Sequence, residues 1–89
     1  MKTYTIRETY APLFSDRIRI HDHTGTLEEL TQAFSYTLTV GKSYERERGN
    51  RKINLAPKTI SSLVNNLNNA RDNAARNGYS GYDYRIVEG

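Results

Sequence analysis

Residues 57–77, PKTISSLVNNLNNARDNAARN, constrain the fold of this chain more than any other stretch. Apolar side chains recur there at helical spacing, and no glycine or further proline interrupts them; they are Ile60, Leu63, Val64, Leu67, Ala70 and Ala74. Steps of three and four residues place them on one stripe. We therefore predict an amphipathic helix of about five turns that forms much of the core. Arg71 falls near the middle of this stripe, so we expect its stem to lie over the core edge beside an acidic partner.

The opposite face of this helix is predicted to carry Asn66, Asn69, Asn73 and Asn77. Asparagine is a mediocre helix former, and a face that only meets water usually carries Glu, Lys or Gln. A row of carboxamides offers donors and acceptors without charge. Such a face suits the backbone of a partner protein or, as an alternative, the edges of nucleic acid bases. The other interpretation is compositional drift on an exposed helix.

The chain has 89 residues, which is enough for one core, and we assign residues 1–89 to a single domain. It contains no cysteine, which excludes disulfides, a thiolate nucleophile and cysteine-ligated metal. The first ten residues alternate in polarity, unlike a signal peptide, and no apolar run approaches the ~18 residues of a membrane helix. We expect a soluble protein of the cytoplasm.

Alternating side chains predict three strands, at residues 2–10, 16–21 and 82–87. In the first strand, Glu8 is the exception among apolar positions. In the second, we expect Ile18 and Ile20 to face the core and Arg17 and Arg19 to face outward. The first two strands are expected to form a hairpin, followed by a turn-rich link at residues 21–25.

Another helix is predicted from Leu27 to about Gly41, because Thr26 and Glu29 have the spacing of a capping box. Residues 36–40 are β-branched and aromatic, and compete as a strand. Residues 43–55 are expected to form an ordered loop, with a short hairpin as the alternative. The expected fold class is α+β: a three-stranded, mainly antiparallel sheet with two helices packed on one face, in the order β-β-α-loop-α-β.

The positive charge of the chain is concentrated in one segment. The net charge is +3, from 13 basic and 10 acidic residues. Residues 42–52 contain two carboxylates, Glu45 and Glu47, and five basic side chains, which are Lys42, Arg46, Arg48, Arg51 and Lys52. The rest of the chain is left with eight residues of each sign. The whole formal excess therefore lies in these eleven residues.

This segment is the strongest indication of binding in the sequence. Arginine and tyrosine amid mixed charge are typical of protein-binding surfaces. Arginine also pairs with phosphate, and Tyr44 is suited to stacking on a base, although Glu45 and Glu47 would oppose a phosphate backbone. A third interpretation is a solvated loop whose charges pair with one another.

The sequence offers little for catalysis or metal binding. His21 and His23 point the same way on an extended chain and could share a zinc ion, but a site needs a third ligand such as Asp16 or Glu28. The simpler interpretation is two polar residues at the end of a strand. Nucleophile-and-base motifs and phosphate-binding glycine loops are absent from the sequence, so we expect neither an enzyme nor a cofactor.

The small cysteine-free chain opens with a Lys-Thr-Tyr-Thr-Ile strand and places two predicted helices on a small sheet. In this it resembles accessory proteins of phages and plasmids, and among these it is similar to anti-CRISPR proteins. The resemblance implies a stoichiometric inhibitor without a catalytic site. Its basic excess departs from the strongly acidic members that mimic DNA.

We therefore expect a phage or mobile-element protein that binds a host protein or ribonucleoprotein, in particular a CRISPR–Cas effector. The contact is expected through residues 42–52 and through the asparagines at 66, 69 and 73. The alternative is a nucleic-acid-binding accessory or regulatory protein that uses the same basic residues. We expect neither a membrane partner nor a small-molecule substrate.

Overall fold

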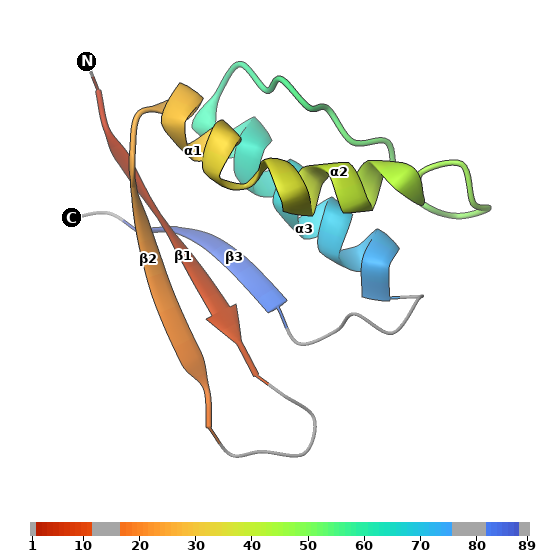
Figure 1. The fold of residues 1–89 in the computed structure, drawn as a ribbon, viewed down its shortest axis with the longest axis horizontal. Helices are drawn as coiled ribbons and strands as arrows, with labels where there is room; N and C mark the ends of the chain where they lie inside the picture. The colour runs from red at the N-terminus through yellow and green to blue at the C-terminus, as the bar shows by residue number, and fades with distance from the viewer. Residues whose placement is uncertain (1, 12–16, 76–81, 88–89) are drawn as a thin grey trace.

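A three-stranded antiparallel sheet carries all the helices on one of its faces (Figure 1). The computed structural model describes residues 2–11, 17–75 and 82–87. The strands are β1 (Tyr4–Tyr10), β2 (Arg19–Gly25) and β3 (Tyr82–Val87), in the spatial order β2-β1-β3. The helices are α1 (Leu27–Ala33), α2 (Ser35–Ser43) and α3 (Ile60–Ala75). The expected α+β class, with an antiparallel sheet, is confirmed.

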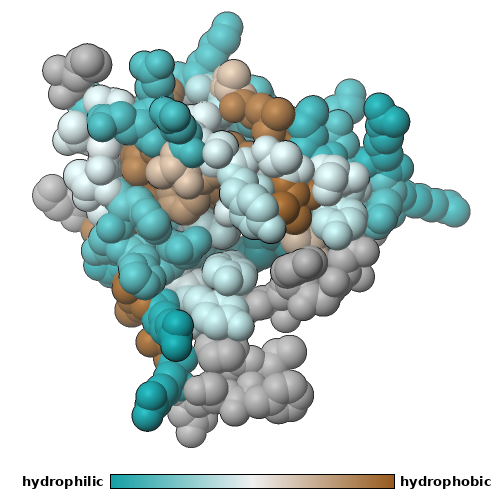
Figure 2. Space-filling view, viewed as in Figure 1, coloured by the Kyte–Doolittle hydropathy of each residue, from teal (hydrophilic) through white to brown (hydrophobic). Residues whose placement is uncertain are grey.

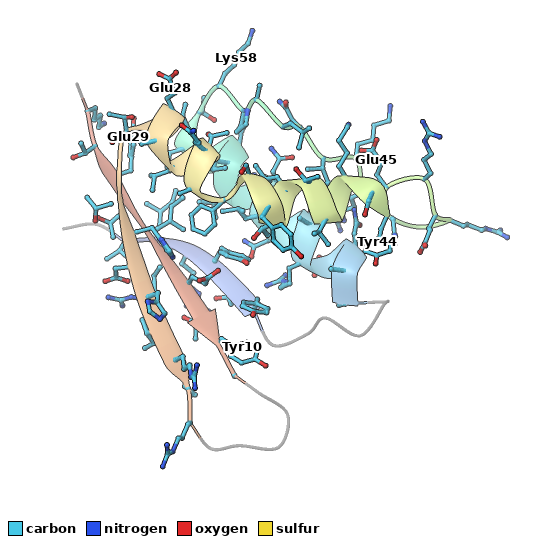
Figure 3. The ribbon with its side chains drawn as sticks, in the orientation of Figure 1. Tyr10, Glu28, Glu29, Tyr44, Glu45 and Lys58 are labelled. Atoms are coloured by element: carbon cyan, nitrogen blue, oxygen red, sulfur yellow. The ribbon has the colours of Figure 1, made fainter. Side chains whose placement is uncertain are left out.

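The described residues form three helices where the sequence predicted two, because the first predicted helix is interrupted at Phe34. This residue has φ −97° and ψ 13°, outside the helical range. Its ring is buried and packs edge-on against His23 and Tyr84, at centroid distances of 4.7 and 5.7 Å. The capping box of Thr26 and Glu29 is present, as predicted (Figure 3).

Residues 36–40, for which the sequence pattern also allowed a strand, lie in α2. Leu38 and Gly41 are buried on this helix, and a Cβ added to Gly41 would lie only 2.3 Å from the Cβ of Ala70. Glycine therefore permits α2 and α3 to approach closely. Packing of this face on α3 outweighs the β propensity of the segment.

The second strand is displaced from its prediction. It runs from Arg19 to Gly25, so the expected turn-rich link is part of the strand. Its register places His23 opposite Ile6, on the face that the helices cover. Because strand side chains alternate, Ile20 falls on the other face. Ile18 and Ile20 are 62% and 57% exposed, so the expectation that they face the core is wrong.

The predicted apolar stripe of α3 is confirmed, with Leu63, Val64, Leu67, Ala70 and Ala74 buried and Ile60 partly buried. The helix begins at Ile60 and not near Pro57, because the Thr59 hydroxyl accepts the N–H of Ser62 at 3.1 Å and caps the first turn. Its predicted end at Asn77 lies outside the described residues. Ile6, Leu30, Phe34, Leu38, Ile53 and Tyr84 complete the core.

Residues 44–59 contain neither helix nor strand, in agreement with the predicted loop and not with the alternative hairpin. The segment leaves the end of α2 and returns along the helices to the start of α3 (Figure 1). Ile53, 3% exposed, anchors it in the core. Of the basic residues predicted as a binding site, Lys42 lies in the last turn of α2, and the other four lie on a loop whose course is fixed by contacts with the helices.

Candidate functional site

Asparagine side chains fix the chain after α2 to α3. The Oδ1 of Asn73 accepts the N–H of Arg51 at 2.9 Å, and its Nδ2 donates to the carbonyls of Arg51 and Gly41 at 2.8 and 3.1 Å. One carboxamide thus pairs with both backbone groups of Arg51, as a neighbouring strand would. Extended chain without a strand neighbour needs such partners, and a carboxamide carries both a donor and an acceptor.

Two further asparagines extend this attachment toward the start of α3. The Oδ1 of Asn66 accepts the N–H of Asn54 at 2.9 Å, and its Nδ2 donates to the carbonyl of Ser62 at 2.8 Å. The Oδ1 of Asn69 lies 3.4 Å from Nη1 of Arg51, a longer and more exposed contact. The asparagines therefore line the side of α3 that faces residues 51–54.

These contacts correct the prediction of an exposed asparagine face. Asn66 and Asn73 are 9% and 1% exposed, so neither side chain is presented to a partner. The predicted chemistry, a carboxamide paired with backbone, is present, but the backbone belongs to this chain. Asn69 is half-buried, and Asn77 lies outside the described residues.

A second attachment joins the end of α2 to the same loop. The Nζ of Lys42 lies 3.2 Å from Oε1 of Glu45 and 3.4 Å from the carbonyl oxygen of Ile53. The Oε2 of Glu45 accepts the N–H of Ile53 at 3.1 Å. This backbone hydrogen bond, and then the Lys42 ammonium, lower the pKa of the Glu45 carboxyl. The negative charge of Glu45 (Figure 3) is thus balanced by Lys42 and the N–H of Ile53.

The first part of the loop is organised by turns around Tyr44. Its carbonyl accepts the N–H of Glu47 at 3.1 Å and Nδ2 of Asn50 at 2.8 Å. Gly49, with φ 85°, occupies the left-handed conformation that the tight turn requires. The Tyr44 side chain is half-buried, which leaves part of it at the surface.

The remaining charges of the loop face outward. Arg46, Arg48, Arg51 and Lys52 are all exposed, against the single exposed carboxylate of Glu47. Within the part of the chain that the structure describes, Arg46 and Lys52 make no hydrogen bond or ion pair. Figure 2 shows hydrophilic atoms projecting at the right margin, where Figure 1 has the chain after α2. We call these four basic residues the cationic loop.

The two histidines have a structural explanation. Their rings are 6.4 Å apart, and the ring of His23 packs on Phe34 with its Nε2 3.5 Å from Oε1 of Glu8. Among the described residues, no three His, Cys, Asp or Glu side chains are placed to hold a metal ion together. Asp16, one predicted third ligand, lies outside the described residues.

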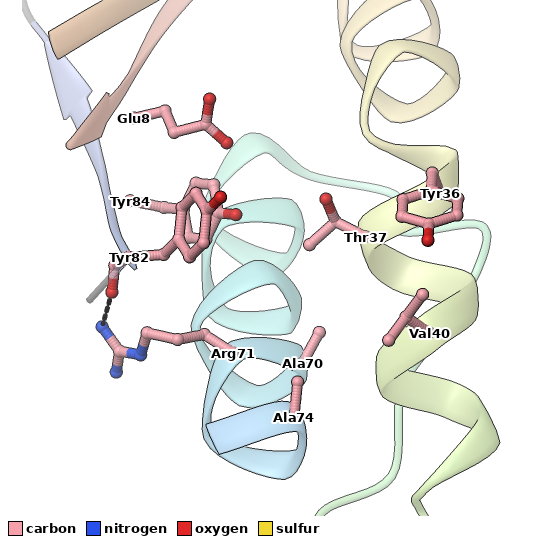
Figure 4. Close-up of a pocket in the computed structure, with 9 residues that line it drawn as sticks. All are labelled: Glu8, Tyr36, Thr37, Val40, Ala70, Arg71, Ala74, Tyr82 and Tyr84. Atoms are coloured by element: carbon pink, nitrogen blue, oxygen red, sulfur yellow. Dashed lines mark hydrogen bonds between the residues drawn. The ribbon is translucent and has the colours of Figure 1, made fainter. Parts of the chain in front are cut away.

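The sequence did not predict a cleft of about 340 Å³ between α2, α3 and the sheet. Figure 4 shows Tyr82 and Tyr84 on one side of it and Tyr36 and Val40 on the other. Ala70, Ala74, Thr37, Glu8 and Arg71 complete the lining. The sequence feature that could have indicated this cleft is Glu8, the one charged residue among the inward positions of β1. It lies over the core beside Tyr84.

Several polar groups that line this cleft have partners in the described part of the chain. Burial, and then the negative charge of Glu8, raise the pKa of the Tyr84 hydroxyl far above its ordinary value. The Nη1 of Arg71 lies 3.1 Å from Oδ1 of Asp83 and donates to the Tyr82 carbonyl at 3.3 Å (Figure 4). This confirms the predicted acidic partner of Arg71. The cleft therefore presents mainly apolar walls, whereas the cationic loop presents exposed charges, of which Arg46 and Lys52 make no hydrogen bond or ion pair among the described residues.

Comparison of the chain with protein-family models, with curated protein sequences and with solved structures gives no match. None of the helices in the described part of the chain has both the length and the apolar character needed to cross a membrane.

Proposed function

We propose that this chain is a non-enzymatic binding protein whose cationic loop docks on an anionic surface of a larger complex. We further propose that it comes from a phage or mobile element and inhibits a host defence complex in the host cytoplasm, in the manner of anti-CRISPR proteins. The target would be a CRISPR–Cas effector, a ribonucleoprotein. The observation that carries the proposal is the attachment of the cationic loop to α2 and α3.

This attachment favours binding because it orders the loop in advance. A loop whose backbone becomes ordered only on binding loses conformational freedom, at about 1–2 kcal/mol for each residue that is fixed. Here Asn73, Asn66 and Glu45 already hold the backbone of residues 51–54. Less of the interaction energy is then offset by ordering the chain.

The electrostatics of the loop also favour an anionic partner. Lys42 and Glu45 neutralise each other, which leaves four outward cations and one outward carboxylate. Charges at the surface act over about 8 Å at physiological salt, so the partner must contact the loop directly. Arginine forks bind carboxylates and phosphates through two parallel hydrogen bonds.

The test is inhibition of DNA cleavage by a panel of purified CRISPR–Cas effectors. The wild-type protein should inhibit at least one of them, and Arg46→Glu/Lys52→Glu should abolish that inhibition. The matched control is Lys2→Glu/Lys58→Glu, which makes the same charge change at exposed sites that are not part of the cationic loop. Failure of the wild type against every effector would refute the proposed target. Equal behaviour of the two double variants would refute the proposed surface.

One observation favours a second candidate, direct binding of nucleic acid by the same loop. Glu45, which would oppose a phosphate backbone, is held by Lys42 and the Ile53 N–H and does not project outward. If three to four cations contact phosphates, affinity should fall roughly 40- to 150-fold for duplex DNA, and roughly 20- to 50-fold for single strands, between 50 and 200 mM salt. A gel-shift series with single- and double-stranded DNA measures this, and no retardation at low salt would exclude this candidate.

A further inference from the structure

In the described part of the chain, the helices cover the backbone at one edge of the sheet, that of β3, but not at the other edge, that of β2. The outer edge of β3 is closed by α3: Oδ1 of Asn68 accepts the Tyr84 N–H at 3.2 Å, and its Nδ2 donates to the Tyr84 carbonyl at 3.1 Å. Arg71 also donates to the carbonyl of Tyr82. By contrast, β2 pairs with β1 only, and no other described strand lies along its second side (Figure 1).

The register shows which backbone groups of β2 face this open edge. Tyr84 directs its N–H and carbonyl toward Asn68, away from β1, so its opposite residue Glu8 directs its own groups toward β2. His21 lies opposite Glu8 and therefore faces β1. Because the direction alternates along a strand, Ile20, Asp22 and Thr24 turn their N–H and carbonyl groups to the open edge.

The open edge lacks several of the features that usually prevent pairing with another chain. Natural edge strands are protected by lysine, proline, bulges or a covering element. The register of β2 with β1 is continuous over seven pairs, and residues 17–25 contain neither lysine nor proline. Ile18 and Ile20 are instead 62% and 57% exposed, and Figure 2 shows hydrophobic atoms at the lower left margin, on the side where β2 lies.

The side chains of this edge indicate the chemistry of a partner. Arg17 and Arg19 are exposed and alternate with Ile18 and Ile20. Side chains directly opposite each other on neighbouring strands lie on the same face of the sheet. A strand added to this edge therefore places apolar residues beside the isoleucines and acidic residues beside the arginines.

A second copy of this chain paired antiparallel does not supply that pattern. The residues of β2 that share a face with Arg19 are His21, His23 and Gly25, none of which carries a carboxylate. Any antiparallel pairing of two open edges that matches their free backbone groups thus sets Arg19 against arginine, histidine or glycine within these strands.

We propose that the open edge of β2 binds an extended segment of a partner protein as a fourth strand, in which acidic and apolar residues alternate. The added strand pairs its backbone with Ile20, Asp22 and Thr24. This surface is separate from the cationic loop, and the proposal does not depend on the function proposed above.

The test uses a fluorescein-labelled peptide of alternating Glu and Val, measured by fluorescence anisotropy against the wild-type protein. Ile20→Pro should weaken binding at least about tenfold and leave thermal unfolding nearly unchanged, because the lost N–H faces the open edge and not β1. The matched control is Ile86→Pro on β3. Ile86 is two residues after Tyr84, so its N–H also points away from β1, at the other edge of the sheet. The Ile86→Pro variant loses that N–H and should still bind the peptide. A peptide with Lys in place of Glu should bind at least about tenfold more weakly than the Glu peptide.

Amide hydrogen exchange keeps the proposal testable if a proline variant fails to fold. Peptide binding to the wild type should slow exchange at Ile20, Asp22 and Thr24 and leave His21 and His23 nearly unchanged. Absence of binding, equal binding of the Glu and Lys peptides, or equal loss in both proline variants would overturn the proposal. Self-association that disappears in Ile20→Pro would also overturn it, because a second copy would then occupy the edge.

Discussion

Replacing Asn73 by alanine should destabilise the fold by releasing the cationic loop from α3. The bonds that the substitution removes include three in the described part of the chain, to the N–H and carbonyl of Arg51 and to the carbonyl of Gly41. Each is worth about 1 kcal/mol net, so their loss costs about 3 kcal/mol. Alanine regains up to about 0.7 kcal/mol of helix propensity. The net expectation is a loss of about 2–3 kcal/mol, against a total stability of roughly 4–13 kcal/mol for a domain of this size.

Urea denaturation followed by far-ultraviolet circular dichroism measures this change, with Asn65→Ala as the matched control. Asn65 lies on the same helix, is exposed, and makes no hydrogen bond within the described residues. The Asn65→Ala variant should show only the gain in helix propensity, so the free energies of unfolding of the two variants should differ by about 3 kcal/mol. A difference below about 1 kcal/mol would refute the view that Asn73 carries the attachment of the loop.

Three further predictions concern contacts that position the loop and the sheet. Gly41→Ala should lower the free energy of unfolding by at least about 1–3 kcal/mol in the same denaturation assay, because its Cβ would meet Ala70 at 2.3 Å; unchanged stability would contradict the close approach of α2 and α3. Since the folded pKa of Glu45 is lowered, its stabilising effect should be complete above the unfolded value of 4.5 and be lost as pH falls through the folded pKa. The protection of the Ile53 amide against exchange, corrected for the intrinsic rate at each pH from 7 to 3, should therefore fall at the acid end, and Glu45→Gln should remove that pH dependence. Asn68→Ala should cost about 1–2 kcal/mol and speed exchange of the Tyr84 amide; a protected Tyr84 amide in this variant would contradict closure of the β3 edge.

The sequence predicts α3 well because apolar side chains at steps of three and four residues allow one interpretation. The asparagines on the same helix allow several, since a carboxamide pairs equally well with water, with a partner or with the chain itself. What decides between them is Arg51, which lies 22 residues before Asn73 and reaches it only through the path of the loop. Nothing in the local pattern of α3 specifies that path.

The register of β2 is likewise a non-local property. A shift of one residue exchanges the faces of a strand, and here the faces follow from pairing His23 with Ile6 and from the entry of the chain into α1. Local alternation of Ile18 and Ile20 with arginines predicted the opposite orientation. Glu8 was recognisable as an exception in β1, but its position beside Tyr84 depends on the pairing of β1 with β3.

The account depends on a cationic loop that is already ordered before any partner binds, and amide hydrogen exchange of the free protein tests this most directly. The N–H groups of Arg51, Ile53 and Asn54 are bound by Asn73, Glu45 and Asn66, whereas the N–H of Lys52 makes no hydrogen bond within the described residues. We predict that the three bound amides exchange about tenfold or more slowly than that of Lys52, after correction for intrinsic rates. Equal, unprotected exchange at all four positions would contradict the account.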